Sequence, residues 1–283
     1  MREWIDLELK QGADGEEQDD EDDDEEDDAD EDEEPKLKYQ RLGNSVPEIL
    51  KRESASAIHV HERFIALGTQ EGWIYILDFN GTEIRRFGAH TAVVNCLSVD
   101  KAGEIIASCS DDGTVVLNGL FSAECESFTY QRPVKAVALD GRLGAGGRSK
   151  GGRQFASGGL AGQLLLNEKG WFSTKDKVLH SGEGPIHTVA WADSLLAWAN
   201  DAGVKVYDNA TGQRITYIDR PKGGPRTQAA PCHLVWESPS TLLIGWGDFV
   251  KIALVKERPG RDGAAAAKCA HFAPPSKPPR AVM

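Results

Sequence analysis

The sequence is poor in cysteine and has no long apolar run. Its five cysteines form no C-x-x-C pair and show no spacing typical of a zinc site or a disulfide framework. An odd, scattered set of this kind suits a reducing compartment. No window approaches the 18 consecutive apolar residues of a membrane-spanning helix, and the first ten residues lack the features of a secretory signal. We therefore expect a soluble, cytoplasmic protein.

Residues in patterns that support catalysis or metal binding are equally scarce. His59 and His61 alternate on an expected strand, but no third ligand lies nearby in the sequence. No nucleophile beside a base and no positioned pair of carboxylates can be identified. We therefore expect no enzymatic activity, no metal and no cofactor.

One glycine-rich segment, residues 141–153 (GRLGAGGRSKGGR), interrupts the pattern of strands. It lacks the Gly-Lys-Ser/Thr sequence of a phosphate-binding loop, and strands are expected on both sides. We expect a flexible surface loop. The alternative is a basic contact for an anionic partner or a membrane surface. Its candidate interaction residues are Arg142, Arg148, Lys150 and Arg153.

Negative charge is concentrated near the N-terminus. The formal net charge is -13, but Asp14 to Glu34 alone holds 18 acidic residues among 21, and the chain from Tyr39 onward carries about +4. Such a run repels itself and has almost no apolar surface to bury, so residues 1–38 are expected to be a disordered acidic leader. The leader either keeps the chain soluble or attracts basic partners.

Four similar stretches dominate the rest of the chain. Each consists of an apolar strand, a tight turn closing on glycine and an alternating apolar strand, and the turn glycines Gly72, Gly113, Gly162 and Gly203 lie 41, 49 and 41 residues apart. A period of about 40 to 45 residues with four short strands per unit is typical of a β-propeller blade. The sequence therefore predicts an all-β, WD40-like β-propeller, a fold that usually offers surfaces for partners.

The expected propeller covers residues 43–255, beginning with a strand at Val46 to Leu50. This length supplies about five blades, and the fifth ends after three strands. An incomplete ring is expected, because a propeller must close to cover its first and last blades. Residues 256–283 are rich in Arg, Gly, Ala and Pro, which predicts a disordered tail. This change in composition suggests a truncated or alternatively spliced product.

His90, Ser108 and Asp112 have the spacing at which WD-repeat blades place a loop histidine, a strand hydroxyl and a turn aspartate. We expect a buried hydrogen-bonded network that ties the loop between two blades to a hairpin turn. In this respect the chain resembles the WD-repeat family. The tryptophan that usually completes the network is replaced by Asn118, so the repeat is degenerate.

Longer stretches are similar to the amino-terminal propeller of the vacuolar protein sorting-associated protein 41 family, whose members are subunits of the homotypic fusion and vacuole protein sorting (HOPS) tethering complex. The resemblance covers residues 33–255. It is carried by EEPKLKY (33–39), FIALGTQEGWIYILDFNG (64–81), LHSGEGPIHTVAW (179–191), LLAWANDAGVKVYD (195–208), QRIT (213–216) and TLLIGWGDFVKI (241–252).

The resemblance implies a role in vesicle docking and fusion at the late endosome and the vacuole or lysosome. It also implies peripheral attachment to those membranes and three kinds of partner: other tethering-complex subunits, a late-endosomal Rab-type GTPase and a vesicle adaptor coat. No nucleic acid is expected. The alternative is a WD-repeat scaffold whose acidic leader binds basic nuclear or ribosomal proteins.

Overall fold

The computed structural model describes residues 39–140, 154–169, 174–221, 231–247, 249–258 and 266–271. The acidic leader and the four basic loop residues lie outside these ranges. The chain divides into two compact units, Met1–Gln40 and Arg41–Met283, and every helix and strand described below belongs to the second. No helix in the described ranges is long and apolar enough to cross a bilayer.

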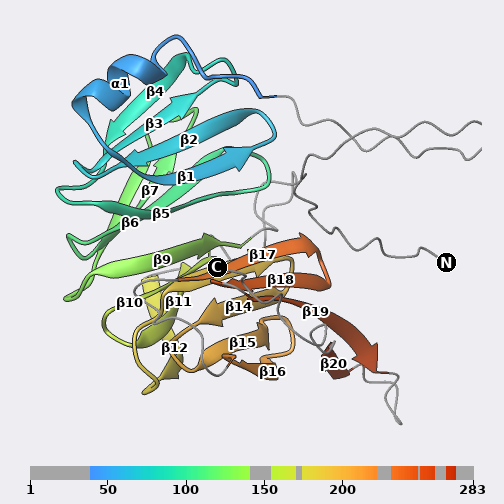
Figure 1. Cartoon of the computed structure of the whole chain (residues 1–283). Helices are drawn as coiled ribbons and strands as arrows, with labels where there is room; N and C mark the ends of the chain where they lie inside the picture. Colours follow the sequence, from blue (N-terminus) through green and yellow to red (C-terminus); the bar gives the residue numbers. More distant parts are fainter. Residues whose placement is uncertain are drawn as a thin grey trace, which may run out of the picture. The chain divides into compact units, whose positions relative to one another are not determined.

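Five antiparallel, four-stranded sheets make up the fold (Figure 1), and each is built from four consecutive strands. We refer to the sheets as blades 1 to 5. Blade 1 contains β1 (Ala55–His61), β2 (Phe64–Thr69), β3 (Trp73–Leu77) and β4 (Glu83–Gly88). Blade 2 contains β5 (Val94–Val99), β6 (Ile105–Ser110), β7 (Thr114–Gly119) and β8 (Cys125–Thr129). Blade 3 contains β9 (Val134–Leu139), β10 (Gln154–Gly159), β11 (Gln163–Lys169) and β12 (Thr174–Ser181).

Blade 4 contains β13 (Thr188–Ala192), β14 (Leu195–Ala199), β15 (Gly203–Asp208) and β16 (Gln213–Asp219). Blade 5 contains β17 (Cys232–Ser238), β18 (Thr241–Trp246), β19 (Phe249–Arg258) and β20 (Ala266–His271). The expected turn glycines Gly72, Gly113 and Gly162 have φ values of 93°, 81° and 69°, which a residue with a side chain rarely adopts.

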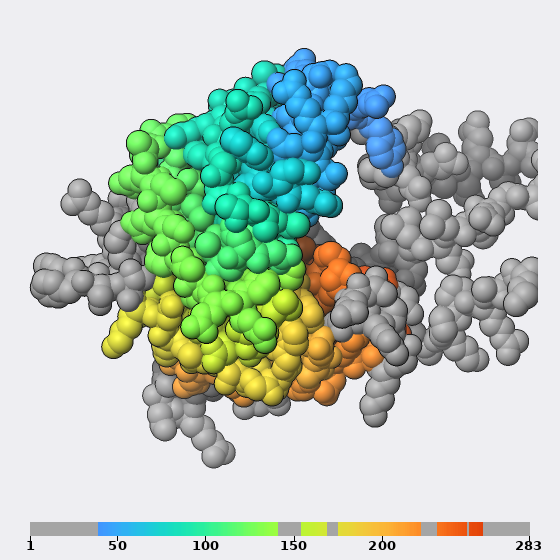
Figure 2. Space-filling view, turned by 90° about the vertical axis from the view of Figure 1, so that its left-hand side faces the viewer, coloured from blue at the N-terminus to red at the C-terminus, as the bar shows by residue number. Residues whose placement is uncertain are grey.

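Consecutive blades pack through their first strands. β1 packs on β5, β5 on β9, β9 on β13 and β13 on β17. Figure 2 follows the same order on one face, from the blue N-terminal blade through green to yellow and orange. Within the described residues, β17 does not pack on β1 in this way. The prediction of an all-β propeller of about five blades in an open ring is therefore confirmed.

A small residue allows each blade to approach the next. The fifth residue of the second strand is small in every blade: Gly68, Cys109, Gly158, Ala199 and Gly245. A Cβ atom added at Gly158 would lie 2.6 Å from Ile186 Cβ, and one added at Gly68 would lie 2.7 Å from Val94 Cγ1. The apolar residue that enters the next blade fills this space, and apolar cores form between consecutive sheets.

The expected strand at Val46 to Leu50 is wrong, because Val46–Arg52 is a helix, α1. The sequence carries helix signals there: a proline in the first turn, Glu48 near the N-terminus and two basic residues in the last turn. Val46 and Ile49 pack on the face of blade 1 that points away from blade 2. A helix therefore covers part of this end of the array.

The expected tail boundary also requires correction. β19 extends to Arg258, and β20 pairs with it from Ala266 to His271, so the fifth blade has its fourth strand. The last three residues of β19 and all of β20 lie in the region expected to be disordered. The alanine-rich composition gave no strand signal, but an outer strand is held by backbone hydrogen bonds along a sheet edge and needs little apolar alternation.

Candidate functional site

The residues of the expected network meet at the boundary between blades 1 and 2. His90 lies in the connection between β4 and β5, and its backbone N–H donates to Gly72 O at 3.1 Å. Its Nε2 lies 2.7 Å from Ser108 Oγ, and its Nδ1 lies 2.8 Å from Thr114 Oγ1. The Thr114 hydroxyl donates to Asp112 Oδ1 at 2.7 Å. Asp112 is connected to His90 directly, with its Oδ2 3.3 Å from His90 Nδ1, and also through Thr114, a residue that the spacing in the sequence did not indicate.

The donors and acceptors of this network define one state of the histidine. Because the Thr114 hydroxyl donates to Asp112, its oxygen accepts a hydrogen bond from the N–H at His90 Nδ1. His90 Nε2 then accepts from the Ser108 hydroxyl. Burial lowers the pKa of His90 and outweighs the opposing effect of Asp112, so the ring is neutral at pH 7.

Asp112 is held as a carboxylate by several donors. Its Oδ2 accepts from Thr91 N–H at 2.9 Å, and its Oδ1 accepts from Thr114 N–H at 2.9 Å. Burial alone would raise the pKa of Asp112, but the hydrogen bonds from Thr114 and Thr91 outweigh it and lower that pKa. With their protons and lone pairs engaged in this way, these groups support the structure of the propeller rather than chemistry on a substrate.

Blade 3 uses a different residue at the corresponding position. Tyr130 N–H donates to Gly113 O at 2.7 Å, just as His90 N–H donates to Gly72 O. The phenol is buried beside Ser157 and Asn167, and burial, followed by the charge of Asp176, raises the pKa of Tyr130 to about 12. A neutral aromatic residue therefore replaces the histidine.

An ion pair lies at the boundary between blades 3 and 4. The Lys205 ammonium on β15 contacts Glu183 Oε2, and Asn200 Nδ2 donates to the same oxygen at 3.2 Å. The hydrogen bond from Lys205 has the largest effect on the pKa of Glu183. Together with the hydrogen bond from Asn200 it outweighs desolvation and lowers that pKa. The sequence analysis missed this pair because Lys205 alternates with apolar residues on an ordinary strand.

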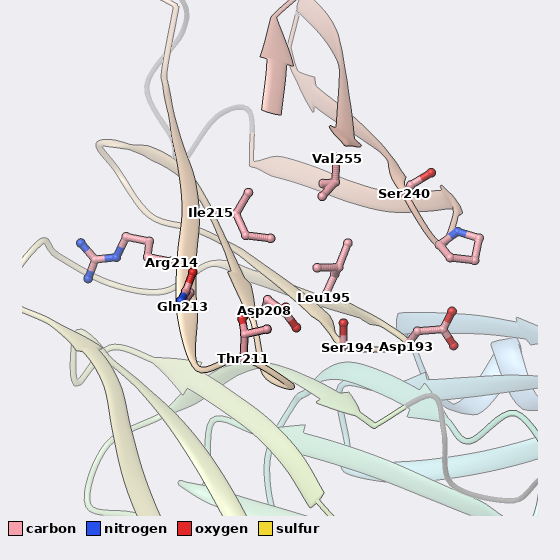
Figure 3. A pocket seen from close by; sticks show the side chains of 11 residues that line it. Asp193, Ser194, Leu195, Asp208, Thr211, Gln213, Arg214, Ile215, Ser240 and Val255 are labelled. Carbon is pink, nitrogen blue, oxygen red and sulfur yellow. Dashed lines mark hydrogen bonds between the residues drawn. The ribbon is translucent and has the colours of Figure 1, made fainter. Parts of the chain in front are cut away.

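A pocket of about 380 Å³ lies where blade 4 meets blade 5 (Figure 3). Three hairpin turns contribute to it: those between β13 and β14, between β15 and β16, and between β17 and β18. Leu195, Ile215 and Val255 supply its apolar surface, and Figure 3 shows Arg214 and Asp193 on opposite sides of these three side chains. No motif in the sequence indicates this pocket, because its residues come from three separate turns.

The charged side chains of the pocket differ in whether neighbouring residues already bind them. Asp208 accepts hydrogen bonds from Ala210 N–H at 3.0 Å and from the Thr211 hydroxyl at 2.8 Å. Asp193 and Arg214 are both exposed, and no other residue in the described ranges forms an ion pair with either side chain. Asp193 also has a φ of 47°, unusual for a residue other than glycine. Within the described residues, the pocket thus offers a carboxylate and a guanidinium that form no ion pair, with an apolar surface between them.

This arrangement suits binding rather than catalysis. In an extended polypeptide every second side chain points to the same face. A partner segment with a basic, an apolar and an acidic residue on one face could therefore pair with both charges and bury the apolar residue between them. Among the described residues, no group of three or more His, Cys, Asp or Glu side chains could hold a metal ion. His59 and His61 belong to no such group.

Comparisons with known proteins identify relatives over most of the chain. The Vps41 propeller family model, described as "Vps42 beta-propeller", matches residues 37–274. A "Vacuolar protein sorting-associated protein 41 homolog" from Solanum lycopersicum is 55% identical over 79% of this chain and 23% of its own length. The homologue from Arabidopsis thaliana is 54% identical over 79% of the chain and 22% of its own length, and that from Homo sapiens is 42% identical over 80% and 26%.

Solved structures support the fold alone. The β-propeller domain of Cps50 (Swd1) from Myceliophteria thermophila superposes with a TM-score of 0.60 at 17% identity, over 75% of this chain and 70% of its own. A chain of the Mitotic Checkpoint Complex gives a TM-score of 0.54 at 20% identity, over 73% and 62%. The present chain spans about a quarter of the length of the curated relatives that it matches.

Proposed function

Because the chain belongs to the Vps41 β-propeller family, we propose that it is a non-enzymatic protein-interaction module of a membrane-tethering complex. It acts in vesicle docking and fusion at the late endosome and the vacuole or lysosome, and so in protein transport to the vacuole. The observation that carries this proposal is the family match across residues 37–274, which includes all five blades.

The contact surfaces of the propeller support a binding role. The pocket between blades 4 and 5 offers charges of opposite sign, without ion-pair partners among the described residues, beside apolar side chains, as a docking site for an extended segment requires. The His90 network, in contrast, joins the connection between two blades to a hairpin turn and keeps its polar groups paired. We assign it a structural role and assign the pocket to partner binding.

The proposed partners are other subunits of the tethering complex, a late-endosomal Rab-type GTPase and a vesicle adaptor coat. The protein is cytoplasmic and attaches peripherally to late-endosomal and vacuolar or lysosomal membranes through these partners. The basic residues Arg142, Arg148, Lys150 and Arg153 provide a second candidate contact, toward an anionic partner or membrane surface.

Proximity labelling of the full chain in cells tests the function. Fusion to a biotin ligase should label tethering-complex subunits and late-endosomal or vacuolar membrane proteins. Labelling mainly of nuclear or ribosomal proteins, lost when residues 1–38 are deleted, would instead support a scaffold that binds basic partners through its acidic leader.

A matched pair of variants tests the pocket in the same assay. Arg214→Glu reverses the free positive charge and should remove part of the labelled set. Arg132→Glu is the control, because it reverses an exposed arginine on the connection between β8 and β9, away from the pocket. An equal effect of both variants would show that net charge, and not the pocket, determines the partners.

A further inference from the structure

Two cysteines face each other across the first two strands of blade 2. Cys96 on β5 and Cys109 on β6 are direct partners in the antiparallel register. In such a pair the Cα atoms lie about 4.5 to 5.5 Å apart and both side chains point to the same face of the sheet. This separation lies within the range that a disulfide bond spans, about 4.4 to 6.8 Å.

The side chains of the two cysteines also interact. Cys109 is completely buried in the core between blades 2 and 3, and the half-buried Cys96 packs against that core. A hydrogen bond joins the two sulfur atoms. Cys96 Sγ also lies 3.5 Å from the backbone oxygen of Val137 on β9, so it contacts the next blade.

The thiol groups of Cys96 and Cys109 differ in acidity. The hydrogen bond from Cys109 lowers the pKa of Cys96 to about 7. Burial raises the pKa of Cys109 well above its ordinary value. Of the two thiols, Cys96 is therefore the more easily deprotonated, and the thiolate is the reactive form of cysteine.

No other cysteine of the chain has a cysteine opposite it in the sheets. The register places Asn118 opposite Cys125, Trp246 opposite Cys232 and Val255 opposite Cys269. The pairing of Cys96 with Cys109 could not be recognised from the sequence. Their separation of 13 residues depends on the length of one hairpin and on an irregularity in the register between Val94 and Cys96.

We propose that Cys96 and Cys109 form a reversible intrachain disulfide when the protein meets a peroxide. The Cys96 thiolate attacks one oxygen of hydrogen peroxide, the O–O bond breaks and a sulfenic acid forms. The hydroxide that leaves takes up the proton released by the Cys96 thiol and becomes the first water. The Cys109 sulfur then attacks the Cys96 sulfur, which forms the S–S bond and releases a second water. The two thiols lose two electrons and two protons, and the peroxide is reduced to two waters.

The reaction would change the boundary between blades 2 and 3. The disulfide would fix β5 to β6 and remove the Cys96 thiol hydrogen that can be donated to Val137 O. A dithiol reductant would reverse the change by thiol–disulfide exchange. This inference concerns the chemistry of blade 2 and does not depend on the tethering role.

Counting thiols in the full chain tests the proposal. The reduced protein is treated with hydrogen peroxide, unfolded in acid, alkylated with N-ethylmaleimide and weighed. Five adducts are expected before oxidation, one for each cysteine, and three afterwards, and dithiothreitol should restore five. Unreduced peptide mapping should find the peptides of Cys96 and Cys109 linked. Retention of five adducts, or a linkage between other cysteines, would overturn the proposal.

Two variants sharpen the result. Cys125→Ser removes the exposed cysteine of β8 and should still lose two adducts, from four to two. Cys109→Ala should fold, because Gly68, Gly158 and Ala199 hold the same place in other blades. It cannot form the cross-link, so Cys96 should stop at the sulfenic acid and react with dimedone. Failure of dimedone to label Cys96 in this variant would contradict its assignment as the attacking thiol.

Discussion

Lys205 is buried, and its ammonium contacts the carboxylate of Glu183 at the boundary between blades 3 and 4. Only 5% of the Lys205 side chain is exposed, whereas 41% of the Glu183 side chain remains open to solvent. The lysine has therefore lost most of its hydration and depends on this carboxylate, while the glutamate keeps part of its own. The two members of the pair should respond differently to substitution.

We predict that Glu183→Gln lowers the free energy of unfolding by about 2 kcal/mol, whereas Lys205→Met changes it by less than about 1 kcal/mol. The first change leaves a buried ammonium without a negative partner, and the second removes the charge that is costly to bury. The first value is set below the usual cost of breaking a fully buried pair because solvent screens Glu183. Urea denaturation of both variants measures the difference, and equal losses would contradict this account.

The pKa of His90 leads to a prediction about acid. Burial lowers that pKa below its ordinary value of 6.5, as it also does for His59 and His180. As the pH falls below about 6.5, the unfolded chain takes up protons before the folded one does. The contribution of these histidines to the free energy of unfolding should therefore be constant above this pH and decrease below it, toward the lowered folded-state pKa values.

His90→Ala tests the contribution of this one ring. The variant should lose about 2 kcal/mol at pH 7, since the hydroxyl groups of Ser108 and Thr114 lose a buried partner. It should also show a smaller slope of unfolding free energy between pH 6.5 and 5, by up to about 1.4 kcal/mol per pH unit. Denaturation across this range measures both effects. An unchanged slope would show that His90 is not a source of the acid sensitivity.

The sequence predicted those features that are encoded in short, repeated patterns. Turn glycines such as Gly72 and Gly113 identified the hairpins, because few other residues adopt their backbone conformation. The spacing of His90, Ser108 and Asp112 identified three side chains that the structure brings to one boundary.

Features that depend on contacts between distant segments could not be predicted in this way. Thr114 joins the His90 network because the fold brings the start of β7 beside the connection between β4 and β5. The pocket between blades 4 and 5 is assembled from three separate turns. Helix α1 was interpreted as a strand because its apolar residues fit either period over so short a length. β20 has no apolar alternation and is recognised only by its pairing with β19.

The helix provides a simple test of its packing. Ile49 is 7% exposed and lies against blade 1, whereas its neighbour Leu50 is 49% exposed. Ile49→Ala should lower the free energy of unfolding by about 2 kcal/mol, at the low end of the range for buried aliphatic residues because the helix lies at one end of the array. Leu50→Ala should cost less than about 0.5 kcal/mol. Comparable losses in the two variants would show that α1 does not dock through this face.

The small residue near the end of the second strand has different surroundings in blades 3 and 5. Gly158 and Gly245 hold the same position in blades 3 and 5, but only Gly158 is contacted by an apolar residue of a following blade. A Cβ at Gly158 would lie 2.6 Å from Ile186 Cβ, far inside van der Waals contact. At Gly245 the nearest atom would be His233 Cβ, at 3.9 Å.

Gly158→Ala should therefore lower the free energy of unfolding by about 1 to 3 kcal/mol, because blade 4 must move away to admit the methyl group. Gly245→Ala should stay within about 0.5 kcal/mol of the parent chain, since among the described residues its methyl group meets only His233 Cβ, at an ordinary van der Waals distance. Thermal and urea denaturation of the two variants make the comparison. A large loss at Gly245 would mean that a further segment packs on blade 5 in solution. A neutral result at Gly158 would mean that blades 3 and 4 are not in the close contact described here, and that the small residues do not set the spacing of the blades.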